Sequence, residues 1–155
     1  MRKLLFSVLA FLSVLGACTS PQSSQLKTDY TQLVNPFIGT DFTGNTYPGA
    51  QAPFGMVQLS PDNGLGGWDR ISGYFYPDST IAGFSHTHLS GTGAGDLYDV
   101  LFMPVTLPYK EAKGELGIHS KFSHQDEEAS AGYYRVKLQD YNINVELTAT
   151  PRCGI

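Results

Sequence analysis

The stretch NINVELTAT, residues 142–150, decides the fold class, because apolar and polar side chains alternate along its whole length. Every second side chain of an extended strand lies on the same face, so this stretch would present one apolar face, built from Ile143, Val145, Leu147 and Ala149. The stretch YYRVKL, residues 133–138, alternates in the same way. The short connection over residues 139–141 predicts that the two strands form an antiparallel hairpin with one buried face.

Outward from this hairpin, the chain predicts short strands joined by turns. The 17 glycines and 9 prolines interrupt the sequence too often for long helices. The expected strands cover residues 56–59, 73–76, 80–84, 97–105 and 118–124. Residues 97–105 are the most apolar and are expected to be central, residues 118–124 to pair beside the hairpin, and 73–76 to pair with 80–84. The sequence therefore predicts an all-β fold, an antiparallel β-sandwich.

Two further stretches have simple interpretations. Residues 125–131 are the one helix candidate, but the acidic cluster of Asp126, Glu127 and Glu128 is more simply a solvated turn. Cys153 is expected to be a small buried or half-buried strand residue rather than a nucleophile, because little around it in sequence would activate a thiol.

The composition indicates a folded domain and argues against a nucleic-acid-binding surface. Hydrophobic residues make up 41% of the chain and charged residues only 15%, which favours a buried core over disorder. The formal net charge of -4 at pH 7 leaves no basic surface for nucleic acid.

The N-terminus has the features of an export signal. Arg2 and Lys3 precede an apolar run over residues 4–15, which is too short for a permanent membrane span. The run leads into LGAC, residues 15–18, which resembles a bacterial lipobox with Cys18 as the lipidated residue. The alternative is an ordinary signal peptide followed by an incidental cysteine.

These features divide the chain into three parts. Residues 1–17 are predicted to be a lipoprotein signal peptide, residues 18–33 a lipidated Cys18 with a polar tether, and residues 34–155 the folded domain. Two or three acyl chains on Cys18 would anchor the protein durably. The expected location is the bacterial cell envelope, as an exported and membrane-anchored lipoprotein on the periplasmic face or the cell surface.

Trp68 is the best candidate for a binding residue. It is the single tryptophan and follows the glycines of the loop LGG, residues 65–67. An indole on such a loop could stack on the apolar face of a sugar, with Asp69 as a partner for a sugar hydroxyl. The alternative is a large side chain that fills the interior of the sandwich.

His86 and His88 form a second candidate pair, because side chains two residues apart share one face of a strand. An H-x-H metal site is one interpretation and would need a third ligand, such as His119 or His124. The surrounding hydroxyl residues favour a hydrogen-bonding or sugar-contacting role instead.

The acidic residues predict neither a catalytic pair nor a metal site. General acid–base catalysis by two carboxyl groups needs one protonated and one ionised group that face a common site. Asp62, Asp69, Asp96 and Asp99 are more simply turn-capping residues. No acidic loop of the EF-hand kind is present in the sequence, so we assign no metal and no catalytic residue to this chain.

A set of motifs, in a fixed order, resembles the start of glycoside hydrolase family 92. The resemblance extends from residue 34 to residue 155, and its motifs are VNPFIGT (34–40), YPGA (47–50), APFGMVQLSPD (52–62), SGY (72–74), GFSHTHLSGTG (83–93), Asp96, MP (103–104), His124, Glu127, GYY (132–134) and ELTATPR (146–152).

The resemblance implies an exported, calcium-dependent, inverting exo-α-mannosidase, with an expected preference for α-1,2 linkages, that trims mannose from N-glycans. In that family an N-terminal β-sandwich precedes a catalytic (α/α)6 barrel. This chain matches the sandwich only, so the resemblance implies a C-terminally truncated N-terminal domain without the barrel. In that family a sandwich loop reaches the sugar pocket, which supports Trp68 and Asp69 as residues that bind mannose-containing glycans, with His86 and His88 as further candidates for sugar contact. The resemblance also implies that calcium is held mainly by the missing domain and not by this fragment.

Three functions follow from these observations. The first is the sandwich domain of the mannosidase, which alone would be inactive. The second is a non-catalytic carbohydrate-binding lipoprotein. The third is a metalloenzyme that uses the H-x-H pair, His86 and His88.

Overall fold

The computed structural model describes residues 28–64, 66–107 and 117–155; the predicted signal peptide, Cys18 and most of the tether lie outside the described residues. In chain order the described elements are η1 (Tyr30–Leu33), β1 (Ala50–Gln51), β2 (Gln58–Asp62), η2 (Trp68–Arg70), β3 (Thr80–Ile81), β4 (Gly83–Ser85), β5 (Ser120–Lys121), η3 (His124–Asp126), β6 (Glu127–Ser130), β7 (Tyr133–Leu138) and β8 (Ile143–Thr148). No helix within these ranges is long and apolar enough to cross a membrane.

The predicted hairpin is confirmed as strands β7 and β8. The two strands pair antiparallel, with Tyr133 opposite Thr148 and Leu138 opposite Ile143. Asn142 adopts a φ of 53° where the chain turns between them, a conformation that asparagine tolerates better than most residues. Strand β6 pairs with the other edge of β7, so the sheet order is β6-β7-β8.

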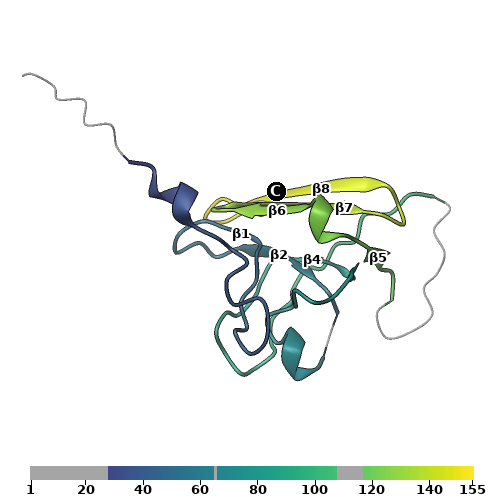
Figure 1. The fold of residues 1–155 in the computed structure, drawn as a ribbon, viewed down its shortest axis with the longest axis horizontal. Helices are drawn as coiled ribbons and strands as arrows, with labels where there is room; N and C mark the ends of the chain where they lie inside the picture. The colour runs from purple at the N-terminus through teal and green to yellow at the C-terminus, as the bar shows by residue number, and fades with distance from the viewer. Residues whose placement is uncertain (1–27, 65, 108–116) are drawn as a thin grey trace, which may run out of the picture.

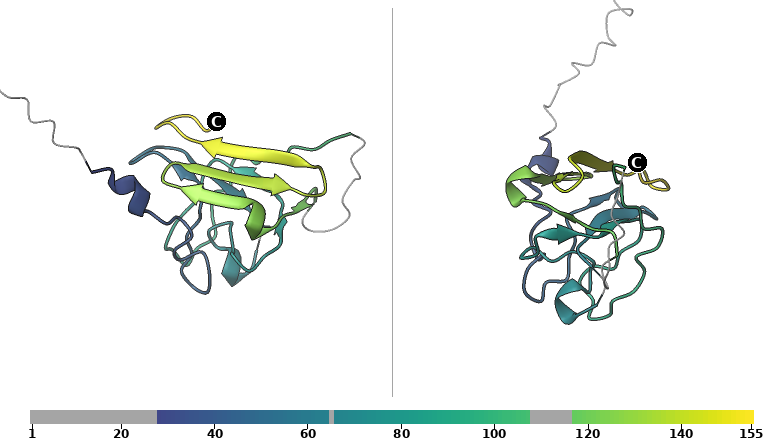
Figure 2. Two further views of the ribbon diagram at one scale, coloured as in Figure 1. Left: turned by 45° about the horizontal axis from the view of Figure 1, so that its top comes forward. Right: turned by 90° about the vertical axis from the view of Figure 1, so that its right-hand side faces the viewer.

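The inward face of this sheet forms the upper half of the core. Tyr134, Val136 and Leu138 of β7 are at most 2% exposed, and Leu147 of β8 is 6% exposed. In Figure 1 this sheet lies as one layer over a second layer that contains β1, β2 and β4. The left view of Figure 2 shows the three long strands side by side over the shorter elements. The expected all-β, antiparallel architecture is thus confirmed, and it is built on one alternating hairpin.

The lower layer differs from the strands that the sequence predicted, and the strand expected over residues 56–59 lies two to three residues later as β2. Strand β2 begins at Gln58 and continues through Pro61 to Asp62, where it pairs with β4. The predicted pairing of residues 73–76 with 80–84 is wrong. Residues 80–84 are divided instead, because β3 pairs with β5 and β4 pairs with β2.

The prediction of a central strand over residues 97–105 is also wrong. This segment contributes one isolated bridge, between Phe102 and Phe84, and its apolar side chains are largely exposed. Leu97, Tyr98 and Val100 have φ values of 80°, 59° and 56°, which bend the backbone out of any extended path. Hydrophobicity alone therefore misidentified an irregular surface segment as a strand.

The predicted pairing of residues 118–124 is wrong, and residues 125–131 contain strand β6 instead of a helix or a solvated turn. Strand β5 pairs with β3 rather than beside the hairpin, and β6 occupies that place. The acidic cluster is consequently not a solvated turn, because the side chain of Glu127 is only 1% exposed. The expectation of a buried or half-buried Cys153 is wrong too, since this free cysteine is exposed after the end of β8.

Candidate functional site

Trp68 lies on the surface at the start of the short turn η2. Two glycines precede it, Gly66 with a φ of 92° and Gly67 with a φ of 83°, conformations that glycine adopts without strain. The Trp68 side chain is 62% exposed, so it does not fill the interior of the sandwich. Asp69 is exposed beside it. The structure therefore presents both predicted sugar-binding residues on one turn.

The other end of this turn is tied to the framework by an ion pair. The Arg70 guanidinium donates from Nε and Nη2 to the two carboxylate oxygens of Asp78, both at 2.6 Å. The hydrogen bond to Asp78 is the main cause of a raised pKa at Arg70. Bidentate pairs of this kind fix orientation as well as distance. The turn therefore has a flexible glycine entry and a restrained exit.

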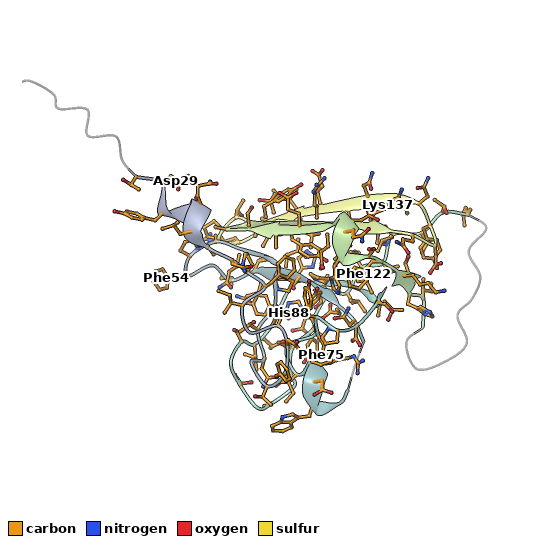
Figure 3. The ribbon with its side chains drawn as sticks, in the orientation of Figure 1. Asp29, Phe54, Phe75, His88, Phe122 and Lys137 are labelled. Atoms are coloured by element: carbon orange, nitrogen blue, oxygen red, sulfur yellow. The ribbon has the colours of Figure 1, made fainter. Side chains whose placement is uncertain are left out.

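His88 lies in the interior, 4% exposed, and connects β2 to the end of β4 (Figure 3). Its Nδ1 lies 2.7 Å from the carbonyl of Gln58, and its Nε2 lies 2.9 Å from Asp62 Oδ1 and 3.0 Å from Ser85 Oγ. Because the Gln58 carbonyl can only accept, Nδ1 donates to it. His88 thus joins the two strands through a buried polar network and offers almost no surface to a ligand.

His86 points to a different part of the molecule. Its Nδ1 donates to the carbonyl of Val100 at 3.0 Å, and its ring meets Phe102 edge-on. The two imidazoles lie beyond the end of β4 at Ser85 and share no hydrogen-bond partner, because that of His86 bonds to Val100 whereas that of His88 bonds to Gln58, Asp62 and Ser85. The structure therefore does not bring His86 and His88 together as a pair.

The structure shows no candidate metal centre in its described ranges. There, no group of three His, Cys, Asp or Glu side chains is close enough to hold a metal ion. The two suggested third ligands are engaged elsewhere: His119 Nδ1 donates to the Gly117 carbonyl, and His124 Nδ1 lies 2.6 Å from Glu127 Oε2. The described residues therefore do not fit calcium or a transition metal.

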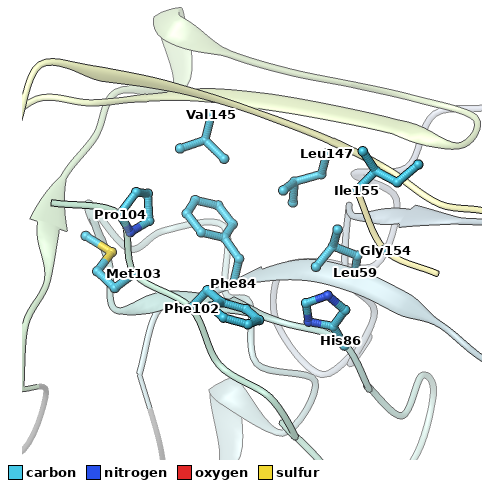
Figure 4. Close-up of a pocket in the computed structure, with 10 residues that line it drawn as sticks. All are labelled: Leu59, Phe84, His86, Phe102, Met103, Pro104, Val145, Leu147, Gly154 and Ile155. Carbon is cyan, nitrogen blue, oxygen red and sulfur yellow. The ribbon is translucent and has the colours of Figure 1, made fainter.

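An apolar pocket of about 430 Å³ opens between the two layers (Figure 4). It is lined by Leu59, Phe84, His86, Phe102, Met103, Pro104, Val145, Leu147, Gly154 and Ile155. Its volume is within the range of small-molecule sites. Its one titratable side chain is His86, so its lining lacks the several convergent polar groups that recognition of a sugar needs.

Sequence reasoning missed a buried cluster around Glu127. The hydroxyl of Tyr74 donates to both carboxylate oxygens at 2.9 and 3.0 Å, and the hydroxyl of Tyr134 donates to Oε1 at 2.6 Å. Burial, with the nearby Glu127 charge second, raises the pKa of both phenols well above the ordinary value. The sequence signal that could have drawn attention to it is the place of Glu127 among the motifs that resemble family 92.

The fold and the site together define an antiparallel β domain that presents Trp68 on an exposed turn and shows no evident catalytic pair among the described residues. Residues 33–155 match the sequence model of the glycosyl hydrolase family 92 N-terminal domain. The chain belongs to glycosyl hydrolase family 92.

Solved structures of the family have the same fold. The chain is 50% identical to a family 92 α-mannosidase from Bacteroides thetaiotaomicron, solved in complex with mannoimidazole, with a TM-score of 0.75 over 80% of this chain and 17% of that one. It is 31% identical to an inverting mannosidase of the family from Bacteroides thetaiotaomicron, with a TM-score of 0.62 over 83% of this chain and 17% of that one.

A curated relative is described as an uncharacterized secreted glycosidase from the fungus Arthroderma benhamiae. It is 28% identical over an alignment of 151 positions, which covers 93% of this chain and 19% of the relative. The chain thus spans less than a fifth of the length of the relatives it matches.

Proposed function

We propose that this chain serves as the N-terminal domain of an inverting exo-α-mannosidase, with an α-1,2 preference, that trims mannose from N-glycans. The observation that carries the proposal is the exposed Trp68 turn in a chain 50% identical to an α-mannosidase solved with mannoimidazole. A restrained, exposed indole is suited to stack on a mannose ring.

In this proposal the turn forms one wall of the sugar pocket. The Trp68 indole packs on the apolar face of the terminal mannose, and the Asp69 carboxylate accepts a hydrogen bond from a ring hydroxyl. The buried hydrogen bonds of His88 suit it to hold β2 and β4 in place behind the turn. His86, half-buried at the edge of the apolar pocket, would reach only a more distant part of the glycan.

The catalytic carboxylates and the calcium ligands are assigned to a second domain. An inverting mechanism requires an acid and a base on opposite sides of the scissile bond. The carboxyl group of Glu127, whose side chain is 1% exposed, is bonded to two tyrosines and a histidine, so it serves the core of this domain. We therefore expect this chain to bind a sugar jointly with that domain and to release no mannose alone.

Export and anchoring form a separate part of the proposal. The predicted lipobox would place the domain on a bacterial cell envelope through acyl chains on Cys18. Metabolic labelling with a radioactive fatty acid tests this: label on the wild-type chain that is lost in Cys18→Ser supports the anchor. Equal labelling of the two chains, or none in either, contradicts it.

The purified chain, incubated with mannobiose and calcium, tests the division of labour. The proposal predicts no release of mannose above a heat-denatured control. Release that disappears in Trp68→Ala would overturn it, because the chemistry would then reside in this chain.

A second candidate is a self-sufficient carbohydrate-binding lipoprotein, favoured by the same exposed indole. Titration of mannobiose against Trp68 fluorescence separates the two functions, since Trp68 is the single tryptophan. Unchanged emission at millimolar sugar supports the mannosidase domain. A saturable change that is absent with an unrelated disaccharide supports the binding lipoprotein.

A further inference from the structure

We infer that Arg70 and Asp78 are positioning residues that hold the Trp68 turn in the orientation needed for sugar contact. The inference rests on the proposed function, because it concerns the same turn. It adds two residues that themselves need not touch the sugar.

The turn itself buries little side-chain surface, and its end is otherwise held through the backbone. The Arg70 carbonyl accepts from the Gly73 amide at 3.0 Å and lies 3.4 Å from the Tyr98 hydroxyl, and the next residue, Ile71, is 6% exposed. The structure records no buried residue in η2 and no side-chain cap at Gly67, the residue before it. On the surface, a segment with few buried contacts opens locally at low free energy. These backbone contacts hold the end of the turn at one point, and the ion pair of Arg70 with Asp78 adds a second point of attachment.

The ion pair is suited to act as this tether. Arg70 is 34% exposed and Asp78 is 16% exposed at the side chain, so solvent screens the pair only in part. Two parallel hydrogen bonds restrict the rotation of the guanidinium, which a single contact would not do. The Arg70 side chain thus links Asp78 to the end of the turn, two residues after Trp68.

Asp78 itself is fixed by the buried framework. Its backbone amide donates to the Phe75 carbonyl at 3.0 Å, and the Phe75 amide donates to Asn63 Oδ1 at 2.6 Å. Asn63 is 1% exposed, and its Nδ2 donates to the Thr80 carbonyl at 2.7 Å. The tether therefore connects the surface turn to an anchored part of the core rather than to another loop.

The experiment measures the motion of Trp68 by time-resolved fluorescence anisotropy in the folded chain. Trp68 is the single tryptophan, so the signal needs no further labelling. The variant Asp78→Asn removes the carboxylate partner, and Arg70→Lys keeps the charge but cannot form the bidentate pair. Glu128→Gln is the matched control, because Glu128 forms an exposed ion pair with Arg135, at 2.8 Å.

Asp78→Asn is expected to increase the amplitude of the nanosecond local motion of Trp68 by about twofold. Arg70→Lys should give a smaller increase, and Glu128→Gln should give none. A merely structural role would lower the urea midpoint without changing this amplitude in the folded state. Amplitudes in both variants equal to those of wild type and Glu128→Gln would overturn the inference, and Arg70→Lys decides alone if Asp78→Asn does not fold.

This outcome is independent of the proposed function. If the variants free Trp68 but Trp68→Ala leaves sugar recognition by the complete enzyme unchanged, the tether stands and the sugar role of Trp68 fails. If the amplitudes do not change while Trp68→Ala abolishes recognition, the sugar role stands and the tether fails.

Discussion

Replacement of Glu127 by alanine should destabilise the chain far more than the same replacement at its neighbour Glu128. Glu127 lies inside the molecule and accepts hydrogen bonds from Tyr74 and Tyr134, whereas Glu128 points into solvent toward Arg135. The two residues are adjacent and chemically identical, so the comparison isolates burial and hydrogen bonding from composition.

The expected magnitude follows from the groups left behind. Tyr74 is 1% exposed and Tyr134 is fully buried, so Glu127→Ala leaves two interior hydroxyls without a partner. Each hydrogen bond to a charged group contributes about 1.5–3 kcal/mol, and a buried hydroxyl left unpaired costs about 1–3 kcal/mol. A loss of about 4 kcal/mol in the free energy of unfolding is therefore expected, against about 0–1 kcal/mol for the exposed pair of Glu128.

Urea unfolding followed by far-ultraviolet circular dichroism measures this difference. With a denaturant slope of about 2 kcal/mol per molar urea, Glu127→Ala should lower the midpoint by about 2 M, and Glu128→Ala by less than about 0.5 M. If Glu127→Ala does not fold, Glu127→Gln should show a smaller loss of about 1–3 kcal/mol. Midpoints for the two alanine variants within experimental error of each other would refute the buried role of Glu127.

Three further predictions follow from the described structure. Leu138→Ala should cost about 4 kcal/mol and Leu147→Ala about 2–3 kcal/mol in urea unfolding, because Leu138 is fully enclosed whereas Leu147 already borders the open pocket; equal costs would contradict this. Burial raises the pKa of Tyr47 to about 12, so the folded chain holds the phenol proton more tightly than the unfolded chain; this stability is present below about pH 10 and is lost as pH rises toward 12. Circular dichroism and phenolate absorbance should then change together, and full phenolate absorbance in a folded chain would count against it. In a Cys18→Ser chain, exposed Cys153 should react with Ellman's reagent without denaturant at the rate of the unfolded chain, and a protected thiol would show that it is buried.

The hairpin could be predicted from the sequence because each of its two strands is long and has one solvent-exposed face. Along residues 133–138 and 142–150 the apolar and polar residues alternate, and this alternation identifies which face of each strand is buried and which faces solvent. The exposed turn at Trp68 could be predicted for a similar local reason, since the glycines before it permit a conformation that other residues avoid.

The remainder depends on contacts between residues distant in sequence. Glu127 resembles any solvated acid until Tyr74, 53 positions earlier, and Tyr134 are brought against it. Residues 97–105 resemble a core strand because a largely apolar run does not show which of its side chains are buried in the fold. A strand of two or three residues, such as β3, is too short to show an alternation of apolar and polar residues.

The central claim is that this chain supplies one wall of a mannosidase whose catalytic residues lie on a second domain. Sequencing the DNA downstream of codon 155 tests it most directly. The account predicts that the following sequence, in frame or displaced by a frameshift, encodes a helical domain several times longer than this chain, with the acidic pair of an inverting glycosidase. Downstream DNA that encodes no such domain in any frame would contradict the claim.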